Sequence, residues 1–218
     1  MIDLSSKRLL VVAPHFDDEV LGCGGVLAGL GESAGVAFVC GRTYGHEPSK
    51  SETDIALGQS ERARAILGYG HSWFGSFYDE YLHEHRVKLL EYIEGVRDQF
   101  NPDVVMIPSR RDMHRDHVVV FEEAVVAFRD VGLLLSYYVP SGSDRSSGYN
   151  QFVPNVLVGL SPGAVDKKVS AMSCYLRESR DFPSPRSPEG IRCTAKFFGM
   201  TAGKHNGAEP FELIRVVA

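Results

Sequence analysis

Three side chains in two separate stretches of the sequence have the types and spacing of a metal site. His15 and Asp18 lie three positions apart in VVAPHFDDEVLGCGG (11–25), so both can reach one cation from a single turn. His117 comes from a second polar stretch, RRDMHRDH (110–117), and would supply a third ligand. Two imidazoles and one carboxylate, with a position left open for water, suit a catalytic zinc ion. Such an ion would lower the pKa of its bound water to about 7 and give a nucleophile at neutral pH.

Three more side chains in the same two stretches could assist a hydrolysis. Asp17 is a carboxylate left over beside the metal and is a natural general base. His114, one helical turn before His117, could present a protonated imidazole to an oxyanion or a leaving amine. Asp116 lies between the two histidines and could orient one of them.

Each cluster also has a purely structural interpretation. Asp17 and Asp18 could simply cap the helix that follows, because carboxylates stabilise helix N-termini. His114 and His117 could be exposed histidines at the start of another helix. The interpretation as one site is favoured because both clusters follow apolar strand-like runs, and ligands of open α/β sheets collect at the carboxyl ends of strands.

The elements that must position these clusters alternate along the chain. Apolar runs predict strands at 8–14, 35–41, 72–77, 103–109, 132–140, 152–160 and 211–217. Helices are expected near 18–30, 53–67, 84–100, 117–130, 163–176 and 188–199. Strands separated by helices predict a single three-layer α/β domain over residues 1–218, with a mostly parallel sheet and helices on both faces.

Composition excludes several classes of function. The 218-residue chain has a net charge of −5 and no basic cluster, so we expect no nucleic-acid partner. Its apolar runs are too short for a membrane span or a signal sequence. Four scattered cysteines without a C-x-x-C pair indicate reduced, mostly buried thiols and predict a cytoplasmic protein. A homo-oligomer is left open.

Glycines after the first strand suggest a competing nucleotide-binding or methyl-transfer function. Gly22, Gly24 and Gly25 follow the acidic cluster instead of forming the turn directly after the strand, and Leu27 stands where a third fingerprint glycine is needed. We expect these glycines to permit close packing of a helix on the sheet.

The two polar clusters resemble the signatures of a known family. APHFDDEVLGCGG is similar to the A-H-P-D-D-E signature of the LmbE/PIG-L family of zinc-dependent N-acetylglucosaminyl deacetylases, and MHRDH is similar to its H-x-D-H signature. Weaker similarities extend over the whole chain, at RAILG (64–68), YDEYL (78–82), DKKVSAMSCY (166–175) and GAEPFELIR (207–215).

The resemblance implies one Zn²⁺ per chain and a Rossmann-like fold. It implies zinc ligation by His15, Asp18 and His117. Asp17 would be the general base, and His114 the electrostatic or acid partner, supported by Asp116. The implied reaction is that of a metal-dependent amidohydrolase, which removes an N-acetyl group from an acetamido sugar or sugar conjugate.

This sequence departs from the family pattern at places that concern the substrate. Phe16 replaces the usual proline of the first signature, which removes no ligand. Ala56 and Gln59 occupy the places of an R-x-x-E arrangement that precedes the L-G helix end. The sugar-binding contacts of the family therefore cannot be transferred to this chain.

Loops rich in Ser, Gly and Pro are expected to border the pocket and to select the substrate. They cover 42–56, 141–151 and 178–188. Within them, Tyr149 and Arg186 are candidate sugar contacts, with solvated loop residues as the alternative.

Two alternative functions stay open. One is a metal hydrolase for another amide or acyl group, and the other is a non-catalytic metal-binding or sugar-binding module. Asp17 and His114 argue against the second, because neither is needed merely to hold zinc.

Overall fold

One seven-stranded sheet forms the centre of the structure, in the order β3-β2-β1-β4-β5-β7-β6. The computed structural model describes residues 4–42, 50–143 and 150–217. The strands are β1 (Leu9–Ala13), β2 (Ala34–Arg42), β3 (His71–Tyr78), β4 (Val104–Pro108), β5 (Leu133–Tyr137), β6 (Val156–Gly159) and β7 (Ala208–Val216).

The sheet is mostly parallel. β1 pairs in parallel with both β2 and β4, and β3 and β5 continue the parallel order outward. β7 is antiparallel to β5 and to β6. Every residue of β1, β4 and β5 is buried, as expected of continuous apolar strands covered on both faces.

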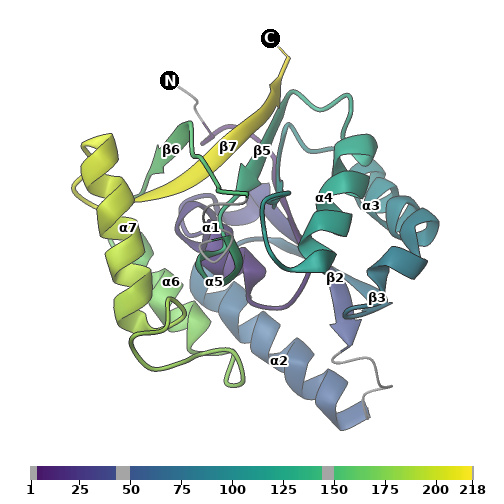
Figure 1. The fold of residues 1–218 in the computed structure, drawn as a ribbon, viewed down its shortest axis with the longest axis horizontal. Coiled ribbons are helices and arrows are strands. Elements are labelled where there is room, and N and C mark those ends of the chain that lie inside the picture. The colour runs from purple at the N-terminus through teal and green to yellow at the C-terminus, as the bar shows by residue number, and fades with distance from the viewer. Residues whose placement is uncertain (1–3, 43–49, 144–149, 218) are drawn as a thin grey trace.

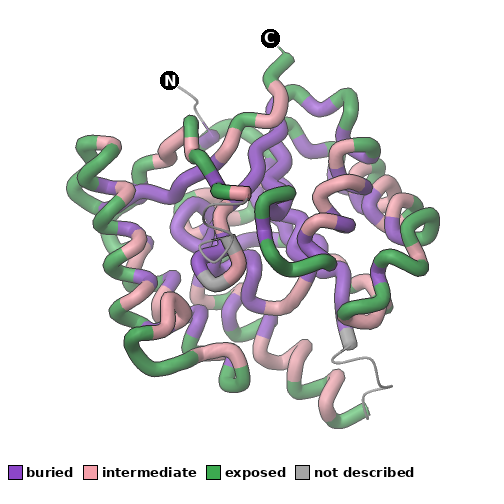
Figure 2. The backbone as a smooth tube through the Cα atoms, viewed as in Figure 1, coloured by how far each residue is buried: buried purple, intermediate pink, exposed green. Residues whose placement is uncertain are grey.

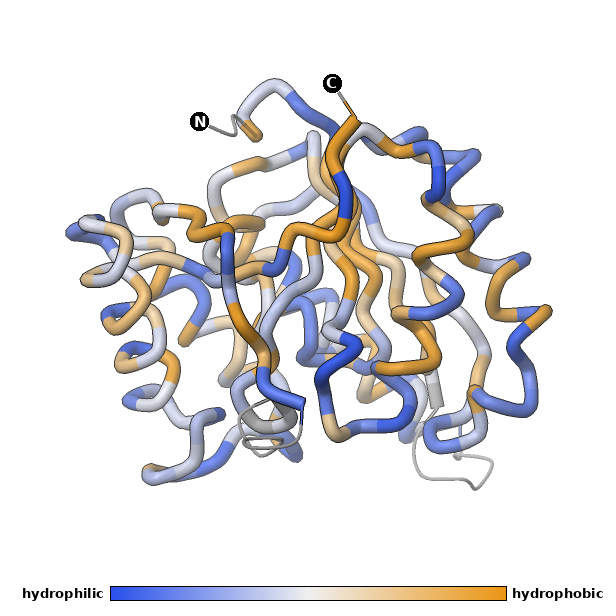
Figure 3. Tube along the Cα trace, turned by 45° about the horizontal axis from the view of Figure 1, so that its top comes forward, coloured by the Kyte–Doolittle hydropathy of each residue, from blue (hydrophilic) through white to orange (hydrophobic). Residues whose placement is uncertain are grey.

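Helices cover both faces of the sheet and give three layers (Figure 1). The first face packs against α1 (Asp18–Leu27), α2 (Lys50–Leu67), α6 (Ala164–Met172) and α7 (Pro188–Ala202). The second face packs against α3 (Arg86–Phe100) and α4 (Arg115–Ala127). Short helices are α5 (Pro140–Ser143), η1 (Gly31–Ser33) and η2 (Leu82–Glu84). The central strands form the hydrophobic interior in Figure 3, so the predicted fold class is confirmed.

Some predicted boundaries are wrong. α2 begins at Lys50, so residues 50–56 are helical and not part of a loop; acidic side chains such as Glu52 stabilise that first turn. β6 is limited to Val156–Gly159, and Pro154, which lacks an N–H, lies just before it. β7 begins at Ala208, ahead of the predicted 211, because Pro210 is accommodated opposite Leu157.

α1 is buried along its whole length (Figure 2). A Cβ atom added to Gly22 would lie 2.3 Å from the ring of Tyr137, and one added to Gly25 would lie 2.6 Å from Leu160. The glycines thus let α1 approach its neighbours closely, which confirms their expected role in packing.

A buried ion pair fixes α1 from the side. Lys168 Nζ lies 2.6 Å from Glu209 Oε1 and donates a hydrogen bond of 2.8 Å to the Leu21 carbonyl. Glu209 accepts hydrogen bonds from the backbone N–H groups of Gly25 (2.8 Å) and Val26 (2.9 Å). α6 and β7 therefore hold the backbone of α1 through a single pair of charges.

Two further predictions from the sequence concern the state of the cysteines and membrane-spanning segments. Cys23 and Cys40 are buried, Cys174 is half-buried and Cys193 is exposed, and none of these described cysteines forms a disulfide. Within the three described ranges, no helix combines the length and hydropathy needed to cross a bilayer.

The ion pair predicts a large difference between two adjacent lysines. Lys168→Met would leave Glu209 buried without its counter-charge and should lower the free energy of unfolding by about 3 kcal/mol. Lys167→Met, at the exposed neighbouring position, should change it by about 0.5 kcal/mol or less. Urea unfolding of both variants measures this, and equal effects would show that the pair does not anchor α1.

Candidate metal and catalytic site

The two polar clusters meet at one edge of the sheet. β1 and β4 are neighbours, and the turn that carries His15 and the loop that carries His114 follow their carboxyl ends. This is also where the strand order reverses direction, which is the usual ligand site of open α/β sheets. A cavity of about 490 Å³ lies there, and it is lined by His15, Asp17, Asp18, His114 and His117.

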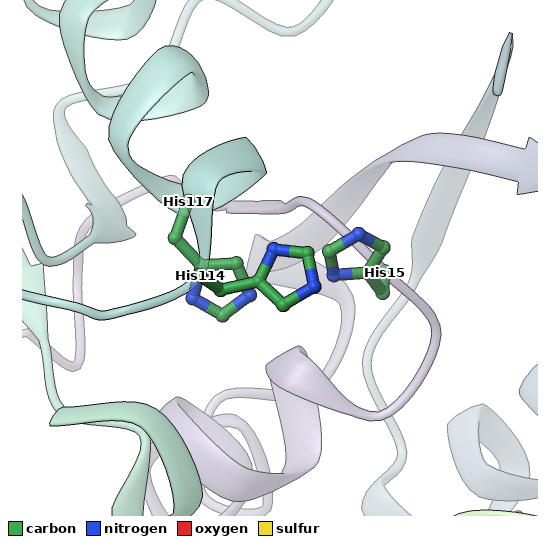
Figure 4. A group of neighbouring side chains, drawn as sticks. All are labelled: His15, His114 and His117. Carbon is green, nitrogen blue, oxygen red and sulfur yellow. The ribbon is translucent and has the colours of Figure 1, made fainter. Parts of the chain in front are cut away.

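Three side chains converge on a single point. His15 Nδ1 lies 3.3 Å from Asp18 Oδ2, and His117 Nε2 lies 3.1 Å from the same oxygen. Figure 4 shows the imidazoles of His15, His114 and His117 side by side, the first from the β1–α1 turn and the others from the start of α4. The three histidines offer ligand nitrogens within 4.8 Å of one another, and the Asp18 carboxylate adds an oxygen beside two of them, so imidazoles and one carboxylate of this group could hold a zinc ion.

The turn between β1 and α1 aims the two neighbouring aspartates differently. Asp17 has a φ of 102°, a left-handed conformation that is costly for a residue with a Cβ. The conformation is held by a hydrogen bond from Asp17 N–H to Glu19 Oε2 (3.1 Å) and another from His15 N–H to Asp18 Oδ2 (2.9 Å). As a result Asp18 faces the imidazoles, while Asp17 faces Arg186.

Phe16 takes part in the same turn. Its ring packs against Phe38, at 5.0 Å between centroids, and against Phe74, at 6.1 Å. The substitution of the family's proline by phenylalanine therefore replaces a rigid residue with one anchored by aromatic contacts.

Two further carboxylates orient the histidines. Asp116 Oδ2 lies 3.1 Å from His15 Nε2, and Asp112 Oδ2 lies 3.1 Å from His117 Nδ1. A carboxylate on one ring nitrogen would leave the other nitrogen as a lone-pair donor for a metal ion. The Asp116 carboxylate thus contacts His15, across the site, and not one of the histidines next to it as we expected. Asp112 is not among the site residues predicted from the sequence, although it belongs to the same RRDMHRDH stretch.

The carboxylates make the site favourable for positive charge. Burial opposes the charged form of His15, but hydrogen bonds to Asp116 and Asp18 outweigh it and raise the pKa of His15 well above 6.5. Burial likewise opposes the charge of His117, but the charge of Asp18 and the hydrogen bond to Asp112 raise its pKa to about 9. A site that stabilises two imidazolium ions has the electrostatics that a divalent cation requires.

Asp17 and Asp18 differ in their affinity for a proton. Burial and the neighbouring charge of Asp18 raise the pKa of Asp17 well above 3.8, although Arg186 Nη1, 3.2 Å from Asp17 Oδ2, partly opposes the rise. Burial would also raise the pKa of Asp18, but His117 and His15 lower it well below 3.8. Neighbouring carboxyl groups with pKa values pushed apart are typical of sites where one accepts a proton and the other stays ionised.

His114 is the N-cap of α4. Its imidazole is uncharged, in contrast to the expectation from the sequence. Its Nδ1 accepts a hydrogen bond of 3.3 Å from Asp116 N–H, so the ring proton lies on Nε2. Desolvation, together with the charges of His15 and His117, lowers the pKa of His114 to about 4. At neutral pH it is therefore an uncharged N–H donor, whereas the sequence suggested an imidazolium.

A second layer of buried contacts supports the turn. The Tyr175 hydroxyl donates a 2.5 Å hydrogen bond to Glu19 Oε1, and the other oxygen of Glu19 holds Asp17 N–H. Burial raises the pKa of Glu19 to about 7. Tyr175, from the segment after α6, thus reaches the turn through Glu19.

The outer part of the cavity contains residues of all three predicted loop segments. Glu52, Gly142 and Glu178 line it, although Glu52 belongs to α2. Arg186 also lines it and contacts both Asp17 and Glu178. Tyr149, the other candidate sugar contact, lies outside the described residues.

Comparisons with known proteins agree with this site. The chain is 27% identical to the uncharacterized deacetylase YaiS of Escherichia coli (strain K12) over 174 residues, 76% of this chain and 89% of that protein. Among solved structures it resembles the conserved protein TT1542 from Thermus thermophilus, with a TM-score of 0.72 and 29% identity over 97% of this chain and 96% of that one.

Two more distant structures share the fold. The N,N′-diacetylchitobiose deacetylase of Pyrococcus horikoshii has 18% identity and a TM-score of 0.69, over 97% of this chain and 85% of that one. GalB, the 4-carboxy-2-hydroxymuconate hydratase of Pseudomonas putida KT2440, has the same identity and TM-score, over 96% of this chain and 98% of that one. One fold therefore carries two kinds of reaction, and at this identity the similarity shows the fold alone.

The family described as PIG-L: GlcNAc-PI de-N-acetylase matches residues 10–128, more than half of the 218 residues. The matched range contains both polar clusters and the strands that position them. The chain therefore belongs to the PIG-L (LmbE-like) family, as its two signatures predicted.

Proposed function

We propose that this protein is a zinc-dependent deacetylase that hydrolyses the N-acetyl group of an acetamido sugar or sugar conjugate. The observation that carries the proposal is the convergence of His15 Nδ1 and His117 Nε2 on Asp18 Oδ2, with Asp17 buried beside them. The similarity to the deacetylase YaiS supports the reaction, and membership of the family described as PIG-L: GlcNAc-PI de-N-acetylase supports both the reaction and the substrate class.

The residues of the site have separate roles in this reaction. Zinc, held by His15, Asp18 and His117, would supply Lewis acidity toward the amide carbonyl and toward water. Asp17 takes the proton of the attacking water, and Arg186 holds its carboxylate in place. When the amide C–N bond breaks, the leaving amine takes up the proton that Asp17 accepted from the water, and acetate is released.

The uncharged His114 donates from Nε2 toward the carbonyl oxygen as negative charge develops there. Asp116 supports it through the backbone N–H that fixes the His114 tautomer, and the Asp116 carboxylate orients His15. Arg186, which we considered as a sugar contact, is engaged with Asp17. Its role at the substrate is therefore secondary in this proposal.

A substrate screen tests the reaction. The zinc-loaded protein should release acetate and a free amine in equal amounts from at least one N-acetylated sugar or sugar conjugate. Release of an amine without acetate would indicate another acyl group. Stoichiometric zinc binding with no hydrolysis of any amide in the panel would indicate a non-catalytic binding module.

The cellular setting belongs to the same proposal. We infer one domain over residues 1–218, a small-molecule substrate, and a cytoplasmic location. The absence of disulfides among the described cysteines supports this location.

Changing Asp17 or Asp18 to asparagine should impair the enzyme in different ways. Asp17→Asn keeps the shape of the turn but removes the base, so kcat should fall about 10²–10⁴-fold while zinc content is retained. Asp18→Asn removes a charged ligand, so zinc content should fall and excess zinc should partly restore the rate.

Zinc occupancy and deacetylation rate of both variants, measured under the same zinc supply, check this prediction. Loss of zinc from Asp17→Asn alone would reverse the two roles. Near wild-type turnover by Asp17→Asn would remove Asp17 as the base.

Metal retention should depend on Asp112 as well as on the ligands. His117→Ala should abolish stoichiometric zinc, and Asp112→Asn should weaken zinc binding about 10–100-fold because His117 loses its orienting charge. Competition with a fluorescent chelator measures both affinities. His83→Ala and Asp98→Asn, at exposed positions, are the matched controls and should bind zinc like the wild type. Unchanged affinity in Asp112→Asn would show that its contact with His117 does not orient the ligand.

A further inference from the structure

One face of α2 forms a wall of the catalytic cavity. Glu52, Ile55, Ala56 and Gln59 all line it, and their spacing places them on one side of a helix. Ala56 and Gln59 are the two positions where the family pattern has a charged R-x-x-E pair. In this chain these two positions of the wall therefore carry no charge.

Two large apolar side chains stand exposed at this cavity. Ile55 on α2 is 58% exposed, and Met113, in the loop between β4 and α4, is 61% exposed. They come from different elements but line the same cavity as the histidines. Exposed apolar surface inside a ligand cavity is stabilised when a ligand removes it from water.

The arginines that line the described cavity are already paired with acids. Arg177 lies 3.8 Å from Glu52, and Arg186 contacts Asp17 and Glu178. An anionic group of a ligand would have to compete with these protein carboxylates for the two arginines. The charges of the cavity thus favour an uncharged group next to the apolar side chains.

We propose, on the basis of the deacetylase function above, that Ile55 and Met113 bind an uncharged apolar group, an alkyl or aryl aglycone, attached to the acetamido sugar. The sugar then lies between this group and the histidines. Selectivity for the conjugate over the free sugar comes from the α2 wall and Met113.

A ratio of rates tests this assignment. We would measure kcat/KM for N-acetylglucosamine, for its octyl glycoside below the micelle concentration, and for N-acetylglucosamine 1-phosphate. The wild type should prefer the octyl glycoside to the free sugar by about tenfold or more, and should show no such preference for the phosphate.

Matched variants assign the preference to these residues. Met113→Gln keeps the side-chain length and Ile55→Gln extends it by one atom; both replace an apolar end by an amide and should each lower the octyl-to-free ratio by about threefold or more. The ratio cancels any loss of folded enzyme. Val87→Gln is the control, because Val87 is 72% exposed on α3, on the other face of the sheet, and should leave the ratio unchanged.

The outcomes separate this inference from the proposed function. Hydrolysis of the free sugar as fast as of the octyl glycoside, a preference for the phosphate, or a ratio that neither variant lowers would each overturn the aglycone site and leave the deacetylase standing. If no acetate is released from any substrate, the deacetylase function fails. Calorimetric binding of the octyl glycoside then decides: weaker binding by Ile55→Gln supports the site, and equal binding overturns it.

Discussion

The left-handed backbone of Asp17 is the constraint on which the rest of the site depends. The φ of 102° at Asp17 makes the side chains of Asp17 and Asp18 point in different directions. An extended or helical backbone at Asp17 would aim them differently. Such a conformation costs about 1–3 kcal/mol and persists only where the surroundings impose it. Here they do so through Glu19, which holds Asp17 N–H, and Tyr175, which holds Glu19. The strain lies where the chemistry needs two carboxylates with different roles.

The burial of α1 makes this turn rigid. α1 begins at Asp18, so any movement of the helix would move this proposed metal ligand. Gly22 and Gly25 let it lie against Tyr137 and Leu160, and the pair Lys168–Glu209 holds its backbone from α6 and β7. Residues far away in the sequence thereby fix the geometry of the turn. The segments 166–175 and 207–215 weakly resemble the family, and this resemblance has a physical reason, because the two segments contain this ion pair.

The sequence was sufficient for the fold and for the meeting of the two polar clusters at one sheet edge, because apolar strands and polar strand ends are local patterns. It was insufficient wherever a contact joined distant segments. Asp116 was assigned to a neighbouring histidine, but the β1–β4 pairing brings its carboxylate to His15. Asp112 was missed because nothing local distinguishes it from a solvated loop residue. His114 was expected to be charged, since its burial beside His15 and His117 cannot be read from spacing. The start of α2 was misplaced because Ser-rich and Pro-rich composition concealed a helix N-terminus.

The central claim is that the turn assigns Asp18 to the metal and keeps Asp17 away from it. Anomalous diffraction from crystals of the zinc-loaded protein tests it most directly, because it locates the ion without reference to activity. We predict one peak per chain, in contact with His15 Nδ1, Asp18 Oδ2 and His117 Nε2, and with Asp17 outside the ligand set. A peak bound by Asp17, or one at the neighbouring group of His15, Cys40 and Asp116, would contradict the account.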